Sequence, residues 1–328
     1  MKRALFILLL FCQSFAFAQD PKFSQYFASP LTLNPALTGY FDGKYRVAIN
    51  TRQQWANVGD PYNTYSASAE VKLRDEFYYE DIFSFGLNGV YDESFNKVLK
   101  SYAYSVSASY YKFMDPDHHF KFGLAPQVAY VANKLDYDAL TVASQFHNGA
   151  FDLSIPNNLG LDNDRLAYFD FNVGANMAFS FDRFSAAVGY GAFHLTRPKA
   201  SLFNDVNLKL PIKHAVNLSF SYYTQDLMDF NFSSHYMAEG NSSDIMVGGL
   251  MGFRPTIDSK FKLNTGVWYK TNEYAFFPYV GFEVANVSLG LNYSVFTRSI
   301  AGFKPRTFEI SMIITDKNFT KFKNTCKF

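Results

Sequence analysis

Apolar and polar side chains alternate with a period of two along much of this chain. From Phe83 to Tyr91 the odd positions carry Phe, Phe, Leu, Gly and Tyr, whereas the even positions carry Ser, Gly, Asn and Val. From Val287 to Val295 the odd positions are again apolar, and Ser, Gly, Asn and Ser occupy the even ones. Because successive side chains of a strand point to opposite faces, this pattern predicts strands with one apolar face and one small or polar face.

About fourteen such segments follow one another, and an even number is typical of single-chain bacterial barrels. The clear segments are 83–91, 102–110, 120–130, 173–181, 184–190, 216–222, 228–236, 287–295 and 308–314, and weaker ones surround Tyr45, Tyr65, Ile245, Leu263 and Phe276. Breaks rich in Gly, Asn and Asp fit hairpin connections between them. We therefore predict an all-β fold, an antiparallel transmembrane β-barrel of about 14 strands. A soluble β-sandwich is the alternative, although its sheets would seldom need so many one-faced strands.

The composition agrees with strands that face lipid. Aromatic residues make up 19% of the chain, with 37 Phe and 23 Tyr, and apolar bands with aromatic girdles would account for this excess. Beyond the first 18 residues, no uncharged apolar run approaches the roughly 20 residues of a spanning helix, whereas a spanning strand needs only about 9–11. The sequence therefore excludes a helical membrane protein and allows a barrel.

Residues 1–18 have the pattern of a secretory signal peptide. Lys2 and Arg3 precede an apolar stretch, and Ala16-Phe17-Ala18 forms a cleavage site. A lipoprotein signal at Cys12 is disfavoured because the bulky Phe11 stands where a small residue is needed. We expect cleavage near Ala18 and a mature protein located in the cell outer membrane. Cys326 is then the only cysteine left, so no internal disulfide can form.

The charges of the mature chain are nearly balanced. Without Lys2 and Arg3 it carries 28 basic and 29 acidic residues, and no basic stripe suggests nucleic acid as a partner. Residues 317–328 form a basic C-terminal tail with four lysines between Phe residues. This tail is expected either to be a solvated periplasmic segment or to contact acidic outer-membrane lipid or a protein partner.

The chain between the signal peptide and the first strand, residues 19–43, is expected to pack against the barrel. Its three prolines forbid a single strand or helix, and it is too apolar for a solvated linker. We expect a plug-like periplasmic segment in or under the barrel mouth, or alternatively an arm packed on the barrel rim. The barrel itself is expected over 44–316, with a long loop at about 133–165 that lies outside or folds into the lumen.

A series of spaced motifs runs through the first 70 residues. It comprises Gln19-Asp20-Pro21, Phe23-Ser24-Gln25-Tyr26, Leu33-Asn34-Pro35-Ala36, Gly39, Arg46, Asn50, Arg52, Gln54-Trp55 and Thr64-Tyr65-Ser66-Ala67-Ser68. In these motifs the chain resembles the PorP/SprF-type outer-membrane proteins of the type IX secretion system in Bacteroidetes. One departure is Leu37-Thr38, where relatives often carry Phe or Tyr with Ala or Ser. Downstream, the resemblance lies mainly in strand pattern and length.

The resemblance implies a non-enzymatic barrel that supports the export or surface anchoring of one secreted protein. Such cargo is typically an adhesin with a C-terminal secretion domain; some relatives serve gliding motility, and others sit with periplasmic components of the secretion machine. The chain is too small to be the pore for folded cargo, so the resemblance favours an accessory role. The barrel pattern alone equally allows a porin or a FadL-like outer-membrane transporter of small solutes.

Two charged residues on inward faces are expected to meet. If the first two strands form a hairpin centred near 57–59, Arg46 lies opposite Glu70 and Arg52 opposite Thr64. This predicts a lumenal ion pair between Arg46 and Glu70. Its role is either to fill and pin the barrel interior, or to act as a gate or a docking point for the N-terminal segment.

No motif in the sequence points to catalysis, a metal or a cofactor. None of the six histidines has metal-ligand spacing, and His118-His119 beside Asp115 and Asp117 indicates a polar turn. His235 would share a face with Asp229 and Ser233, but no nucleophile stands on a strained turn as a hydrolase requires. No Gly-rich phosphate loop or dinucleotide fingerprint occurs. We therefore expect no enzyme activity and no cofactor.

Overall fold

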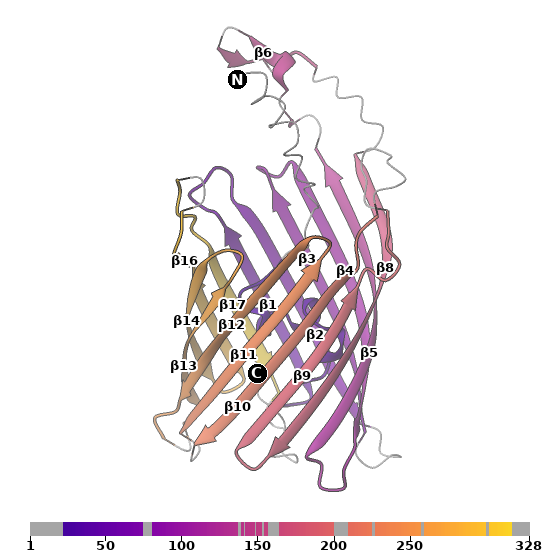
Figure 1. Ribbon diagram of the computed structural model, residues 1–328, viewed down its shortest axis with the longest axis vertical. Coiled ribbons are helices and arrows are strands. Elements are labelled where there is room, and N and C mark those ends of the chain that lie inside the picture. The colour runs from indigo at the N-terminus through magenta and orange to yellow at the C-terminus, as the bar shows by residue number, and fades with distance from the viewer. Residues whose placement is uncertain are drawn as a thin grey trace, which may run out of the picture.

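The computed structural model describes residues 22–74, 81–136, 139–140, 142–147, 149–152, 154–156, 164–199, 209–224, 227–256, 259–299 and 302–316. Fourteen long antiparallel strands form a closed barrel (Figure 1). They are β1 (Tyr45–Gln54), β2 (Tyr62–Arg74), β3 (Ile82–Ser94), β4 (Leu99–Phe113), β5 (Phe120–Leu135), β8 (Arg165–Phe181), β9 (Phe184–Phe193), β10 (Lys213–Thr224), β11 (Met228–Glu239), β12 (Ser242–Phe253), β13 (Phe261–Lys270), β14 (Ala275–Val284), β15 (Val287–Tyr293) and β17 (Phe308–Thr315). The predicted all-β barrel of about 14 strands is confirmed.

The strands follow one another around the wall in chain order, and the first and last close it. β1 pairs with β2 on one side and with β17 on the other. The short strand β16 (Val295–Phe296) continues β15 beyond Ser294, and both pair with β14. Consecutive hairpins need only short turns, which is why local alternation and turn residues are enough to build this wall.

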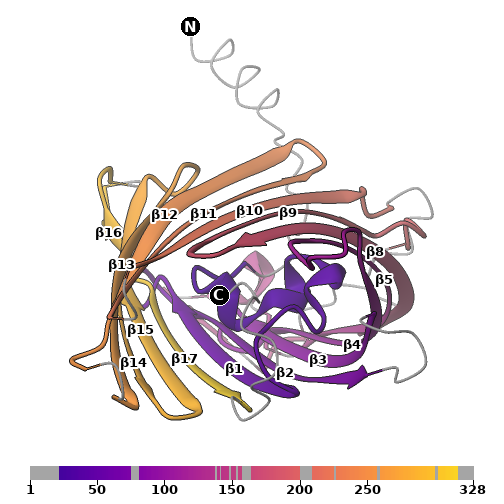
Figure 2. The same cartoon turned by 90° about the horizontal axis from the view of Figure 1, so that it is seen from below.

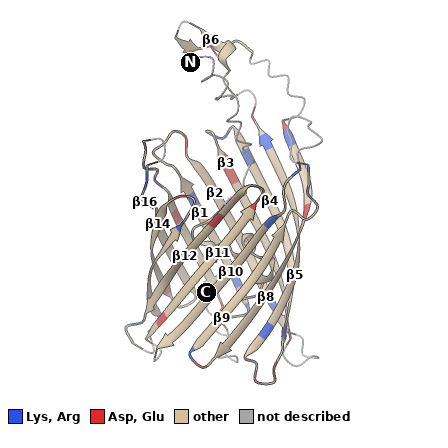
Figure 3. Cartoon of the chain, in the orientation of Figure 1, with Lys and Arg blue, Asp and Glu red and all other residues tan. Residues whose placement is uncertain are grey.

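The strands turn mainly small and polar residues into the lumen and mainly apolar residues outward. In β3, Ser84 and Asn88 are buried, whereas Phe85 and Leu87 are exposed on the outside. Figure 3 shows charged positions scattered mainly toward the two ends of the strands. An outward band of Phe, Leu, Val and Tyr is the surface that a bilayer covers, because hydrocarbon cannot satisfy polar groups. Among the described residues, no helix is long and apolar enough to span a membrane.

The two ends of the barrel differ in the length of their connections. At one end lie the start of β1, the end of β17 and short turns such as Asp182–Arg183 and 285–286. At the other end, residues 136–164 link β5 to β8 and include the hairpin β6 (Phe146–His147) and β7 (Ala150–Phe151), which stands above the rim (Figure 1). Because bacterial barrels have short periplasmic turns and longer external loops, we term the first end inner and the second outer.

The N-terminal segment lies inside the barrel as a plug. It forms three single-turn 3₁₀ helices: η1 (Tyr26–Ala28), η2 (Pro30–Thr32) and η3 (Pro35–Leu37). Seen along the barrel, these turns occupy the lumen and are surrounded by the strands (Figure 2). The plug-like segment of the predicted fold is therefore present, rather than an arm on the rim. The predicted signal peptide, its cleavage site and the basic tail at 317–328 lie outside the described residues.

Candidate functional site: the plugged lumen

The sequence of the plug explains its three tight turns. Pro30 and Pro35 each occupy the first position of a 3₁₀ helix, where a missing N–H costs nothing. The Asn34 side chain caps η3 by accepting a hydrogen bond from the Ala36 N–H at 2.9 Å. This places the Asn34-Pro35 motif at the centre of the plug, where both residues are fully buried or nearly so.

One carboxylate of the barrel wall holds the start of the plug. Glu309, on β17, accepts hydrogen bonds from the backbone N–H groups of Ser24 at 2.9 Å and Gln25 at 2.7 Å. The Gln25 side chain donates to the Glu309 carbonyl and accepts from the Ser311 hydroxyl. Asn50, on β1, also donates to Glu309 at 2.9 Å. A buried carboxylate with several donors is satisfied without a cation, because charge-assisted hydrogen bonds replace its hydration.

The middle of the plug is bound to the opposite wall. The Asn34 amide donates to the carbonyl of Ala175 on β8 at 3.1 Å and to Asn217 on β10 at 3.0 Å. Gly174 makes this approach possible, since a Cβ there would overlap the Asn34 and Ala36 atoms. The plug therefore bridges two sides of the wall and does not hang from one strand.

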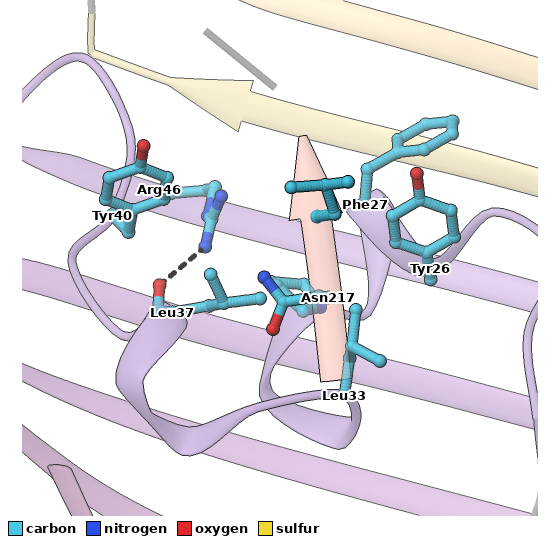
Figure 4. Close-up of a pocket in the computed structure, with 9 residues that line it drawn as sticks. Tyr26, Phe27, Leu33, Leu37, Tyr40, Arg46 and Asn217 are labelled. Carbon is cyan, nitrogen blue, oxygen red and sulfur yellow. Dashed lines mark hydrogen bonds between the residues drawn. The ribbon is translucent and has the colours of Figure 1, made fainter. Parts of the chain in front are cut away.

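The end of the plug is fixed by the residues that the sequence predicted to form an ion pair. Arg46 and Glu70 are paired in register, and an Arg46 guanidinium nitrogen lies 2.7 Å from Glu70 Oε1. Arg46 also donates to the Leu37 carbonyl at 3.4 Å, as Figure 4 shows, and Glu70 accepts from the Gly39 N–H at 3.0 Å. Both charged side chains are buried. The pair thus contacts the plug directly, at the last residue of η3 and two residues after it.

Aromatic contacts complete the packing of the plug. Tyr26 stands edge-on to His235 with ring centroids 4.9 Å apart, and Phe27 packs between Trp268 and Tyr279 at 5.7 and 5.5 Å. Burial raises the pKa of the Tyr26 phenol to about 12. Figure 4 shows the neighbouring cavity, which has a volume of only about 10 Å³. That is room for about one water molecule, so the plug is packed like a protein core at this level.

A cluster of charges surrounds the first described residue of the plug near the outer end. Arg52, at the outer part of β1, donates to the Lys22 carbonyl and also to Glu273 at 3.2 Å. Lys270 lies 2.5 Å from Glu273 and 3.6 Å from Asp244. Burial lowers the pKa of Lys22. Burial would raise the pKa of Glu273, but Lys270 and Arg52 outweigh it and lower that pKa to about 2.

Most residues of the sequence motifs lie in the plug or contact it, and one lies away from it. Phe23, Ser24, Gln25, Tyr26, Asn34, Pro35 and Gly39 lie in the plug, and Arg52 binds it. Trp55 is elsewhere: it follows β1 with a φ of 60° and packs edge-on against Tyr62 at 5.5 Å. The part 19–21 of the first motif lies outside the described residues.

Several residues of the site were not singled out from the sequence. Glu309 is the most important, and its signal was visible, because it is a carboxylate at an inward position between the outward Phe308 and Ile310. Asn217 also lay on a predicted inward face, but its partner Asn34 is 183 positions away. Alternation identifies which residues face the lumen, and it does not identify what they meet there.

Of the hydrolase residues considered from the sequence, Asp229 lies apart from His235, and the Ser233 hydroxyl accepts a hydrogen bond from the Trp268 indole at 3.2 Å. The His235 ring packs against Tyr26, whereas Asp229, six residues earlier on β11, binds Lys262 at 2.7 Å. Six residues of strand separate them by about 20 Å. Within the described part of the chain, no cluster of three or more His, Cys, Asp or Glu is arranged to hold a metal ion.

Comparison with known proteins identifies the family. The model of the family "Type IX secretion system membrane protein PorP/SprF" matches residues 15–314. This chain belongs to the PorP/SprF family. The match covers both the plug and the complete barrel, so the features described above are those of a PorP/SprF protein located in the outer membrane. No curated protein matches the chain significantly.

Solved structures share the fold of this PorP/SprF chain. The CymD monoaromatic hydrocarbon channel is 13% identical, with a TM-score of 0.53 over 88% of this chain and 92% of that one. The toluene transporter TodX of Pseudomonas putida is 11% identical, with a TM-score of 0.49 over 90% and 93% of the two chains. At 13% identity, the likeness to CymD shows the outer-membrane barrel fold alone.

Proposed function

We propose that this protein is a non-enzymatic accessory barrel of the type IX secretion system that binds one exported cargo protein and supports its export or surface anchoring. Family membership carries the proposal. The plug supports a binding role over a conducting one, because its contacts with Glu309, Asn217 and Arg46 of the wall fill the lumen with satisfied polar groups. In this proposal the cargo is a binding partner of the barrel and is not chemically changed by it.

We assign different partners to the two ends of the barrel. The hairpin β6–β7 stands above the outer rim, where Phe146 and Phe151 are exposed and pack on each other at 5.1 Å. Exposed aromatic side chains of this kind are frequent anchors in protein interfaces. The proposal assigns cargo to the outer side, and it assigns components of the secretion machine to the inner end.

Gene deletion tests the function. Cells lacking the protein are expected to lose one large secreted protein from the surface while other exported proteins remain, and a plasmid copy should restore it. If every exported surface protein stays in place in the deletion strain, the cargo-specific role is wrong.

The channel fold of CymD supports one second candidate, a transporter of small solutes. The two functions differ in the state of the lumen. Planar-bilayer conductance of the purified protein separates them: a plugged binding barrel is expected to show no steady ion current, whereas a porin shows stable open steps. Steady open steps in the unmodified protein would favour the transporter.

A further inference from the structure

Strand β8 extends toward the outer side beyond the strand that follows it. Its ladder with β5 runs along its whole length, from Phe120 opposite Phe179 to Lys134 opposite Arg165. Its ladder with β9 covers only the part from Val173 to Phe181. Residues 165–172 therefore form the edge of the sheet on the β9 side, at the outer end of the barrel. An open edge is unusual in a closed barrel, because closure otherwise pairs every strand on both sides.

A buried Asp–His contact ends the β8–β9 ladder at a defined place. β9 stops at Phe193, and His194 adopts a φ of 61°. The Asp170 carboxylate accepts from the His194 N–H at 3.2 Å, from the Thr196 hydroxyl at 3.1 Å and from the Phe171 N–H at 3.0 Å, and His194 Nδ1 lies 2.8 Å from it. The carboxylate thus replaces the strand partner where the two strands separate. The hydrogen bonds of Asp170 therefore fix the point at which β8 and β9 separate.

Beyond this point the two chains have different neighbours. The Leu195 N–H donates to the Phe171 carbonyl at 3.1 Å, which is the last backbone–backbone bond between them in the described residues. The chain after β9 then pairs with itself, since Leu210 donates to Pro198 at 3.0 Å and Lys199 bridges Lys209. The continuation of β9 is therefore used elsewhere, and among the strands that the structure describes none pairs with the outer part of β8 on that side.

The free backbone groups of the edge belong to alternate residues. In an antiparallel ladder, successive residues direct their N–H and C=O groups to opposite sides. The Asp164 carbonyl accepts from Leu135 of β5 at 2.8 Å, so the even-numbered residues bond toward β5. Arg165, Ala167 and Phe169 therefore direct theirs to the open side, where no described residue pairs with them. Their side chains are exposed, and Phe169 retains 70% of its accessible surface.

We propose that this edge, Arg165, Ala167 and Phe169, binds an extended strand of the exported cargo by adding it to the barrel sheet. Only an extended backbone matches donors and acceptors repeated about every 7 Å along a strand. The rings of Tyr130 and Phe169 pack against each other on the outer surface at a tilt of 55°, with centroids 5.2 Å apart. An apolar side chain on the incoming strand would extend this row. This inference rests on the proposed function and adds to it the place and mode of binding.

The charges of the edge favour a different chain over a second copy of this one. Antiparallel pairing of two copies about Ala167 would place Asp164 of one opposite Asp170 of the other, and directly opposed like charges destabilise a sheet. The edge also lies at the outer end, the side on which an exported protein arrives. We therefore assign the strand to cargo.

Hydrogen exchange at single amides tests the strand addition without any mutation. The full chain in detergent is compared alone and with the purified C-terminal domain of a protein that the deletion strain fails to display. In the chain alone, the amides of Leu166 and Tyr168 are expected to exchange slowly and those of Ala167 and Phe169 quickly. With the domain bound, Ala167 and Phe169 should become protected at least about tenfold. Fast exchange of both amides in the bound state overturns the proposed edge, and slow exchange in the chain alone does so too.

A pair of substitutions at one position gives an independent check. Ala167→Pro removes an edge N–H and places a ring against the incoming strand, so binding of the same domain should weaken about tenfold. Ala167→Ser keeps the backbone and should bind as the unmodified chain does. Heat-dependent migration on gels verifies that each variant folds, and if Ala167→Pro does not fold, the exchange pattern decides. If the domain binds without protecting the edge amides and Ala167→Pro does not weaken that binding, the proposed site is wrong but the cargo role stands. If the domain does not bind at all, the proposed cargo role is rejected together with the site.

Discussion

The Glu309 carboxylate accepts a hydrogen bond from the backbone N–H of Gln25 at 2.7 Å, although 284 positions separate the two residues. The contact joins the last strand of the barrel to the first turn of the plug. Since Ser24 and Asn50 donate to the same carboxylate, one side chain satisfies three buried donors. It therefore couples closure of the wall to placement of the plug.

Removing this carboxylate is expected to loosen the plug. In Glu309→Ala, the buried N–H groups of Ser24 and Gln25 lose their acceptor, which should lower the free energy of unfolding by about 3 kcal/mol. Urea unfolding in detergent measures this loss, and bilayer recordings should show transient conductance steps. Asp229→Ala is the matched control, because Asp229 is a buried lumenal carboxylate that binds Lys262 on the wall. A Glu309→Ala protein as tightly closed as this control would contradict the role of Glu309.

Removing one partner of the buried ion pair should be costly, and the two partners should be energetically coupled. Arg46→Ala leaves Glu70 as an uncompensated buried charge, and the expected loss of unfolding free energy is about 3–5 kcal/mol. The double variant Arg46→Ala/Glu70→Ala should lose less than the sum of the two single variants. Urea unfolding of all four proteins gives the coupling energy. Conductance of Arg46→Ala separately tests a gating role, and a current unchanged from the unmodified protein rejects the gate.

Two glycines in the same backbone conformation provide a matched test of plug packing. Gly39 has a φ of 72° and Gly59 a φ of 69°. A Cβ at Gly39 would overlap the Ser84 hydroxyl, whereas nothing lies within 4 Å of a Cβ at Gly59. Gly59→Ala should therefore lower the free energy of unfolding only by the strain of a left-handed alanine, about 1–2 kcal/mol. Gly39→Ala should lower it clearly more, because of the added overlap. Equal unfolding free energies for the two variants would show that the structure accommodates a Cβ at Gly39 without cost, and would contradict tight packing of the plug there.

Acid should weaken the outer charge cluster through Glu273. Its folded-state pKa, about 2, lies below the ordinary value of 4.5, so its contribution to stability is complete above pH 4.5 and declines as the pH falls toward 2. The shift corresponds to a contribution on the order of 3 kcal/mol. Unfolding free energies measured between pH 7 and pH 2 should decrease less steeply for Glu273→Gln than for the unmodified protein. Parallel curves for the two proteins would contradict this.

Local sequence determined the wall of this protein. Alternation depends only on the geometry of a single strand, so it identified the inward and outward residues and about fourteen strands. It also predicted the hairpin register in which Arg46 faces Glu70, because a short turn fixes the pairing of adjacent strands.

Tertiary structure decided the path of the plug and the open edge of β8. The bonds from Glu309 to Gln25 and from Asn34 to Asn217 join residues that no turn relates, so nothing local specifies them. The alternation predicted a strand over 173–181, but β8 begins at Arg165. Residues 165–172 were missed because Leu166 and Tyr168 are apolar like Phe169, which removes the period of two. That β9 leaves this segment depends on the carboxylate of Asp170 meeting His194, a contact that exists only once both strands are in place.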